Sequence, residues 1–295
     1  MRIDAHHHVW DLRRIHYPWL MAKGVRRFFG DPTPIQRNYS VDEFRREAEQ
    51  CGFEASVHIE VGAGDPLAEA EWVNRQSVKS GGWPTVQVAH CDLVREDAET
   101  VLNALVDIPT VRGVRHIIGR SEEEDARTGS NDLLTSRKFA GSLRLLADMG
   151  FSFDLQLTPG LIPRTADLLA GLPSLRVALC HAGSPNRRRD ATIKAWEANL
   201  PRLAALPQLS CKLSGLGMFH HGWTVDEIRP IVETCLDVFG PARCMFGSNF
   251  PVDSLQSTYR DAVRAYEEII PATMHDAVFG GNAAEFYRFP VRKRT

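Results

Sequence analysis

The sequence lacks the closely spaced cysteine pairs from which zinc ribbons and thioredoxin-like redox sites are built. Its six cysteines stand at positions 51, 91, 180, 211, 235 and 244, and no two form a Cys-x-x-Cys motif. Cys180, Cys211 and Cys244 fall within apolar runs, where a free thiol acts as a small hydrophobic side chain. This usage is typical of a reducing compartment, and we expect a cytoplasmic protein.

Long apolar stretches and an excess of one charge are also missing. No run approaches the roughly 18 apolar residues of a membrane span, and the opening MRIDAHHHVW holds no apolar segment of a signal peptide. The 35 Lys and Arg residues nearly balance 37 Asp and Glu residues, which leaves a formal net charge of −2. We therefore expect neither a membrane nor a nucleic acid as partner.

Motifs of several enzyme classes are absent as well. The chain has no G-x-S-x-G nucleophile elbow and no phosphate-binding P-loop. The glycine pairs at 62–64 and 215–217 lack the third glycine of a dinucleotide fingerprint. These absences argue against a serine hydrolase, a nucleotide hydrolase and a nicotinamide or flavin enzyme.

What the sequence does contain is a regular alternation of short apolar runs and amphipathic stretches. Eight runs predict strands, at 2–6, 55–60, 85–90, 113–117, 152–157, 176–181, 209–213 and 244–248. Stretches of helical period lie at 41–51, 65–80, 97–106, 136–149, 163–170, 191–206, 225–239 and 255–270. Ser40 and Glu43 form a capping-box pattern at the first of them. Eight such units predict an α/β protein with one (β/α)₈ TIM-barrel domain over residues 1–295.

Two segments are too long for simple connections. Residues 11–37 form an aromatic and basic stretch after the first strand, and residues 121–134 a charged one after the fourth. Both follow the carboxyl end of a strand, where such barrels place their active sites. We expect these loops to shape a substrate pocket.

Histidines end two of the predicted strands. His6 and His8 are two residues apart, so both point to the same side of the first strand. His181 ends the sixth strand. Three neutral imidazoles that converge can bind one divalent metal, zinc above all, or a substrate oxygen. A hydrogen-bonded structural pair remains the alternative for His6 and His8.

The motifs around these residues resemble those of a known family. They are IDAHHHVW at 3–10, YPWL at 17–20, GVRH at 113–116, CHAG at 180–183, KLSGL at 212–216 and GNAA at 281–284. In this order they are similar to the amidohydrolase-2 family, within its lactonase-like branch of fuconolactonases, sulfomuconolactonase and pyrone-dicarboxylate lactonase. The resemblance spans nearly the whole chain. It implies a TIM-barrel hydrolase that opens a small cyclic ester.

One position departs from the family pattern. The resemblance implies an aspartate after the eighth strand that takes a proton from water, but Asn249 stands there. An amide is not a general base, although it can orient a water molecule. We expect Glu60 to supply the missing carboxylate, with an ion pair to Arg115 as its alternative. Asp253 is a second candidate, but we expect it to cap the following helix.

These observations lead to a working hypothesis of lactone hydrolysis. His6, His8 and His181 polarise the carbonyl of a sugar-acid or related lactone, directly or through one zinc-like ion, while a carboxylate activates water. The residues expected to bind the substrate are Arg115, Asp154, Lys212, His58 and Trp19. Arg115 has an ion pair with Asp154 or Glu60 as its alternative role. A decarboxylase or lactone isomerase on the same barrel, and a binding protein without catalysis, remain alternatives. A homodimer is an expectation by analogy only.

Overall fold

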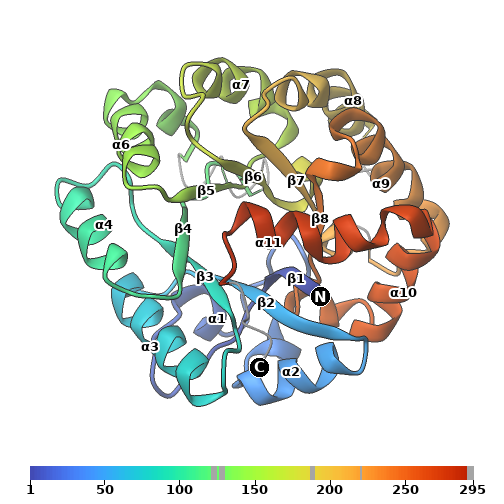
Figure 1. Ribbon diagram of the computed structural model, residues 1–295, viewed down its shortest axis with the longest axis horizontal. Helices are drawn as coiled ribbons and strands as arrows, with labels where there is room; N and C mark the ends of the chain where they lie inside the picture. The colour runs from blue at the N-terminus through green and yellow to red at the C-terminus, as the bar shows by residue number, and fades with distance from the viewer. Residues whose placement is uncertain (121–124, 126–129, 187–189, 220, 291–295) are drawn as a thin grey trace.

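The predicted parallel barrel is confirmed in a computed structural model, which describes residues 1–120, 125, 130–186, 190–219 and 221–290 (Figure 1). Its eight strands are β1 (Arg2–His7), β2 (Phe53–Ile59), β3 (Val86–His90), β4 (Val111–Arg115), β5 (Ser152–Leu155), β6 (Val177–Leu179), β7 (Leu209–Leu213) and β8 (Cys244–Phe246). They follow one another in sequence order, and each pair of neighbours is parallel. Several strands end earlier than predicted, so that His116, Gln156 and His181 lie just beyond the strands.

Two backbone hydrogen bonds join the first strand and His8, the residue after it, to the residues that follow the last strand. The backbone N–H of Asn249 donates to the carbonyl of His6 at 2.7 Å. The N–H of His8 donates to the carbonyl of Phe250, also at 2.7 Å. These two bonds close the barrel at its carboxyl end, because they satisfy backbone groups that the edges of an open sheet would expose.

Helices follow the strands and cover the outside of the barrel (Figure 1). Their bounds are α1 (Pro18–Met21), α2 (Val41–Glu49), α3 (Pro66–Lys79), α4 (Ala98–Val106), α6 (Arg137–Asp148), α7 (Ile162–Ala170), α8 (Asp190–Ala204), α9 (Val225–Phe239), α10 (Tyr259–Ile269) and α11 (Asn282–Phe286). The predicted cap of α2 is confirmed, since the Ser40 hydroxyl accepts from the N–H of Glu43. None of the described helices is long and apolar enough to cross a membrane.

One helix begins four residues later than predicted, and this difference bears on the site. The helix expected at 255–270 begins at Tyr259, and the Thr258 side chain caps it by accepting from the N–H of Asp261. Asp253 lies earlier, inside a short 3₁₀ turn at Val252–Leu255. The prediction that Asp253 caps this helix is therefore wrong, because Thr258 already satisfies the first turn.

The amino end of the barrel is covered by α11, which crosses the face that Figure 1 looks onto. Just after this helix, the Tyr287 hydroxyl donates to both carboxylate oxygens of Asp154 at 2.9 Å. Lys212 forms an ion pair with the same carboxylate at 2.5 Å, and both side chains are fully buried. We call Asp154, Lys212 and Tyr287 the floor cluster. Charges can be buried here because each meets a partner of opposite charge or a hydroxyl.

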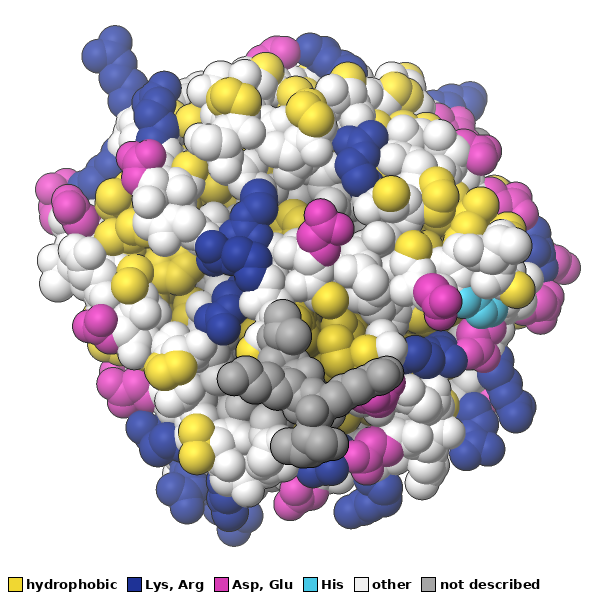
Figure 2. Space-filling model, viewed as in Figure 1, with side chains coloured by type: hydrophobic (Ala, Val, Ile, Leu, Met, Phe, Trp, Pro, Cys, Tyr) yellow, Lys and Arg dark blue, Asp and Glu magenta, His cyan; other side chains and the backbone are white. Residues whose placement is uncertain are grey.

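The cysteines and the charged side chains of the surface agree with what the composition predicts. All six cysteines lie within the described residues and are free thiols, five of them buried. Figure 2 shows positive and negative side chains interspersed over the face that α11 crosses. This mixture fits the near-neutral net charge of −2 and offers no broad basic surface on that face.

The floor cluster generates a stability prediction. Lys212→Met leaves the buried Asp154 carboxylate without its cation, so we expect the free energy of unfolding to fall by about 3–5 kcal/mol. Tyr287→Phe removes only the hydroxyl and is expected to lower it by about 1–3 kcal/mol. Urea denaturation followed by circular dichroism measures both changes.

The matched control is Lys138→Met. Lys138 pairs with Glu96 at 2.6 Å, but Glu96 is fully exposed, so water replaces the lost contact. We expect this variant to unfold close to the wild type. An equal loss in the free energy of unfolding in Lys212→Met and Lys138→Met would show that the buried ion pair of the floor cluster contributes no more than an exposed one.

Candidate active site

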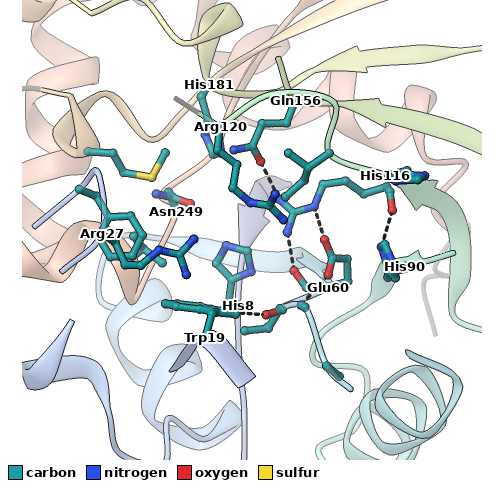
Figure 3. A pocket seen from close by; sticks show the side chains of 18 of the residues that line it. His8, Trp19, Arg27, Glu60, His90, His116, Arg120, Gln156, His181 and Asn249 are labelled. Atoms are coloured by element: carbon teal, nitrogen blue, oxygen red, sulfur yellow. Dashed lines mark hydrogen bonds and ion pairs between the residues drawn. The ribbon is translucent and has the colours of Figure 1, made fainter. Parts of the chain in front are cut away.

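A pocket of about 690 Å³ lies at the carboxyl end of the barrel, and Figure 3 shows side chains that line it. Its polar lining comprises His8, Arg27, Glu60, His90, Asp92, Arg115, His116, Arg120, Ser136, Gln156, His181 and Asn249. The long loop after β1 adds an aromatic wall of Trp10, Trp19, Phe28 and Phe29. The expectation that this loop shapes the pocket is thus confirmed. Of the second long loop, residues 121–124 and 126–129 lie outside the described residues, whereas Leu133 lines the pocket.

The three predicted histidines lie together. The ring centroid of His6 is 5.2 Å from that of His8 and 4.5 Å from that of His181. His8 and His181 line the pocket, whereas His6 is fully buried beside them. Neither ring nitrogen of His6 has a hydrogen-bond partner among the described residues. The sequence prediction that strands β1 and β6 bring their histidines to one place is therefore confirmed.

Two glycines make room for this histidine cluster. A Cβ atom at Gly247 would lie 2.6 Å from the Cβ atom of His6, and one at Gly215 would lie 2.3 Å from Nδ1 of His181. Both distances are shorter than atoms can approach, so a side chain at either position would displace a histidine. His181 itself has a left-handed backbone with φ of 54°. Backbone strain in a non-glycine residue is common at functional sites.

Hydrogen bonds fix the orientation of the two rings that line the pocket. Nδ1 of His8 lies 2.8 Å from the carbonyl oxygen of Ile59. A carbonyl only accepts, so Nδ1 of a neutral His8 carries the proton and Nε2 carries a lone pair. Nδ1 of His181 lies 3.0 Å from the hydroxyl of Ser214, which can donate or accept. In both rings the anchored Nδ1 leaves Nε2 for the pocket.

Burial keeps all three imidazoles neutral. It lowers the pKa of His8 to about 4, and the nearby positive charge of Arg115 acts in the same direction. The pKa values of His6 and His181 lie well below the usual range, first because of burial and then because of neighbouring positive groups such as Lys212 and Arg115. A neutral imidazole can accept a proton, donate a hydrogen bond or bind a metal.

The donor chemistry of this cluster suits zinc, since neutral imidazole is a common zinc ligand and the nitrogens of His6 have no hydrogen-bond partner in the described part of the chain. The arrangement of these side chains does not suit zinc. Among the residues described, no three His, Cys, Asp or Glu side chains form a group that could hold a metal ion. The predicted ligand set of His6, His8 and His181 is therefore not preformed, and we derive no catalytic step through a metal.

Glu60 is committed to Arg115 and to the backbone. Its Oε1 accepts from Nε of Arg115 at 2.6 Å, and its Oε2 accepts from the N–H of Gly62 at 2.6 Å (Figure 3). Burial alone would raise the pKa of Glu60, but the charge of Arg115 and these hydrogen bonds lower it to about 2. A carboxylate this acidic, with both oxygens occupied, is a poor base. The geometry thus corresponds to the alternative of an ion pair with Arg115 and not to the expected base.

Asn249 is held by Asp253. The Asn249 backbone is left-handed with φ of 58°, and its Nδ2 donates to Oδ1 of Asp253 at 2.9 Å. Burial raises the pKa of Asp253 to about 7, although hydrogen bonds from Asn249 and the N–H of Gly217 act against this shift. Asn249 lines the pocket, whereas Asp253 lies behind it. The site therefore keeps a carboxyl group after β8, separated from the pocket by an amide.

Three residues expected to bind substrate do not line the pocket. Asp154 and Lys212 belong to the floor cluster, where they satisfy one another. His58 is fully buried, and its Nδ1 accepts from the N–H of Val9 at 3.3 Å. These expectations are corrected for one reason: the strand pattern shows which side chains point inward but not their depth in the barrel. Arg115 and Trp19 do line the pocket.

The pocket also contains residues that the sequence did not single out for the site. Arg27 and Arg120 enter it from the segments after β1 and β4, and His90, His116 and Gln156 also belong to its polar lining (Figure 3). The basic and aromatic composition of residues 11–37 was a signal for Arg27. No signal marked Arg120, because its position depends on the path of an irregular loop.

Comparisons with known proteins agree with this architecture. The sequence pattern of the amidohydrolase family matches residues 3–289. The uncharacterised protein y4mH of Sinorhizobium fredii is 33% identical over 294 residues, which are 97% of this chain and 98% of that protein. An L-fucono-1,5-lactonase of Burkholderia multivorans is 29% identical over 310 residues, covering 98% of this chain and 97% of the lactonase. A crystal structure of an amidohydrolase from Burkholderia multivorans with bound zinc is 25% identical, with a TM-score of 0.82 over 98% of this chain and 100% of that one.

The barrel, the histidine cluster at its carboxyl end and the match over nearly all of its length lead to one conclusion: the chain belongs to the amidohydrolase family.

Proposed function

We propose that this protein hydrolyses a small polar lactone of the sugar-acid type. The observation that carries the proposal is the pair formed by His8 and His181, two neutral imidazoles whose anchored Nδ1 atoms leave Nε2 for one pocket. One nitrogen has a lone pair for a water proton, and the other can donate to a carbonyl. The likeness to a protein named L-fucono-1,5-lactonase supports the same reaction class.

In the proposed reaction, water attacks the lactone carbonyl while Nε2 of His8 accepts its proton. The proposal assigns to His181 the tautomer in which the hydroxyl of Ser214, 3.0 Å away, donates to Nδ1, so that Nε2–H of His181 donates to the oxygen on which negative charge develops. The ring C–O bond then breaks, and the leaving oxygen takes the proton back from His8. One water is added, and the product is a hydroxy acid. This assigns different roles to His8 and His181, whereas the hypothesis from the sequence has both of them, together with His6, polarise the carbonyl.

Asn249 orients the attacking water in this proposal. Its side chain lines the pocket beside His8, and the bond from its Nδ2 to Asp253 fixes the amide plane. Asp253 is thus a positioning residue, because it acts through Asn249. Arg115, held by Glu60 and by Gln156 at 3.3 Å, forms a rigid polar wall against which the lactone ring can bind.

The roles of the two histidines are tested by substitution. We expect His181→Gln and His8→Gln each to lower kcat/KM for lactone opening by about 10²–10³, since each removes one group that acts in the transition state. A pH-indicator assay of acid release, on a panel of sugar-acid lactones, measures the rates. His275→Gln is the control, because His275 contacts the Ile270 carbonyl and lies outside the pocket. Absence of acid release from every lactone by the wild type would refute the proposed function.

The pH dependence identifies the proton acceptor. His8 must be neutral to accept the proton, and its pKa is about 4. We therefore expect kcat/KM to rise with pH up to about 4 and to be level above it. Lactone consumption followed by NMR between pH 3.5 and 7 gives the profile, and circular dichroism checks that the protein stays folded. A midpoint near 7 would instead assign the step to Asp253, whose pKa is about 7.

Metal removal provides a separate test. Because the proposed steps use only side chains, we expect dialysis against a strong chelator to change kcat/KM by less than about twofold. Mass spectrometry of the metal content before and after dialysis shows whether zinc was present and was removed. Activity that disappears with the zinc and returns when zinc is added would overturn the metal-free route.

A further inference from the structure

We infer that Glu69 is a positioning residue: from behind the pocket, its carboxyl group fixes the segment after β2 that holds Arg115 and Trp19 in the pocket wall. Glu69 belongs to α3 and is only 2% exposed. Arg115 and Trp19 line the pocket, whereas Glu69 does not. This role concerns the shape of the pocket and goes beyond the proposed reaction.

The peptide group between Glu60 and Val61 is held from two sides. From the pocket, Nη2 of Arg115 donates to the carbonyl of Glu60 at 2.6 Å. From behind, Oε1 of Glu69 accepts from the N–H of Val61 at 3.0 Å. A buried peptide group needs a partner for its carbonyl and for its N–H, and here one partner is a pocket residue and the other a helix residue. Glu69 therefore limits the rotation of the peptide that Arg115 contacts.

The next peptide group, between Val61 and Gly62, is held in the same way. Its carbonyl accepts from Nε1 of Trp19, and its N–H donates to Oε2 of Glu60 at 2.6 Å. A Cβ atom at Gly62 would lie 3.4 Å from Cδ1 of Trp19, so the indole packs closely on this segment. Figure 3 shows Trp19 and Glu60 among the side chains of the pocket. A rotation of the first peptide would therefore disturb both the aromatic wall and the Glu60 that holds Arg115.

Glu69 fills this position as a neutral acid. Burial raises the pKa of Glu69 to about 8, and the negative charge of Glu60 acts in the same direction. The Val61 N–H, the charge of Arg115 and the hydroxyl of Tyr17 act against this shift. Oε2 of Glu69 has no hydrogen-bond partner within the part of the chain that the structure describes. A second negative charge beside Glu60 would thus be poorly satisfied, whereas a neutral acid still accepts from Val61.

Three substitutions separate the hydrogen bond from the charge. Glu69→Gln keeps an oxygen that accepts and a group that donates, as in the neutral acid, but it cannot ionise. Glu69→Leu keeps an apolar side chain and removes the acceptor. Glu71→Gln is the matched control, because Glu71 lies on the same helix but is exposed and contacts Arg75 at 3.4 Å.

Fluorine NMR of the protein labelled with 5-fluorotryptophan reports on Trp19 without any substrate. The chain has six tryptophans, and Trp19→Phe identifies the signal. We expect this signal to shift with pH in the wild type, with a midpoint near the pKa of Glu69 of about 8, and to stay constant in Glu69→Gln. In Glu69→Leu it should be displaced already at pH 7. Trp196, which donates to the carbonyl of Ala182, is the internal control. A Trp19 signal that does not titrate in the wild type, or titrates equally in Glu69→Gln, would overturn the inference.

Kinetics at pH 7 measure the consequence for the site. Glu69→Leu should lower kcat/KM for lactone opening by about 10- to 100-fold, because it loosens pocket groups, whereas Glu69→Gln and Glu71→Gln should stay within about threefold of the wild type. Circular dichroism checks the fold of each variant. Because ionisation of Glu69 also loosens the segment, the level region of the activity profile is expected to end near pH 8.

The two measurements separate this role from the proposed function. A loss of activity in Glu69→Gln as large as that in Glu69→Leu would overturn the positioning role and leave lactone hydrolysis standing. If no lactone is opened by the wild type, the proposed function fails, and the fluorine signals of the wild type and of Glu69→Gln still decide whether Glu69 positions Trp19.

Discussion

The hydrogen bonds that join β1 to β8 are the constraint on which the site depends. The carbonyl of His6 accepts from Asn249, and the N–H of His8 donates to Phe250, so the two residues that follow β8 are tied to the histidines of β1. Without this closure, the first and last strands would be sheet edges, and residues almost 250 positions apart would not be neighbours. The same closure explains Gly247, because the strands approach so closely that a side chain there would collide with His6.

The two ends of the barrel differ in how their buried polar side chains are paired. At the amino end, Asp154, Lys212 and Tyr287 satisfy one another and are sealed by α11. At the carboxyl end, Arg115 and Glu60 neutralise each other, whereas the histidines remain neutral and the ring nitrogens of His6 have no hydrogen-bond partner among the residues that the structure describes. Incompletely satisfied buried polar groups lower stability and are typical of functional sites. The neutral histidine cluster supports the proposed site at the carboxyl end, whereas the mutual contacts of the floor cluster favour a structural role.

The sequence predicted the barrel and the place of its site because both follow from local patterns. Eight apolar runs alternate with amphipathic stretches, and His6 and His8 share one side of a strand by the period of two. Partners distant in the chain were less predictable. Asp154 meets Tyr287, 133 residues away, and Glu60 meets Arg115, 55 residues away. The depth of a side chain in the barrel and the path of an irregular loop depend on tertiary contacts, which explains why Lys212 was misplaced and Arg120 missed.

Asn249 stands where the resemblance implies an aspartate, but the nearby Asp253 supplies a carboxyl group. The carboxyl group lies four residues after Asn249, in the short 3₁₀ turn at Val252–Leu255, and burial raises its pKa from the ordinary value of 3.8 to about 7. A carboxyl whose folded pKa is raised binds its proton more tightly in the folded state than in the unfolded one. Its contribution to folding stability therefore decreases as the pH rises from about 4 to about 7 and is unfavourable above that window. A cost that applies at neutral pH is more readily tolerated where the group has a function, and the hydrogen bond that Asp253 accepts from Asn249 supports the positioning role proposed for it.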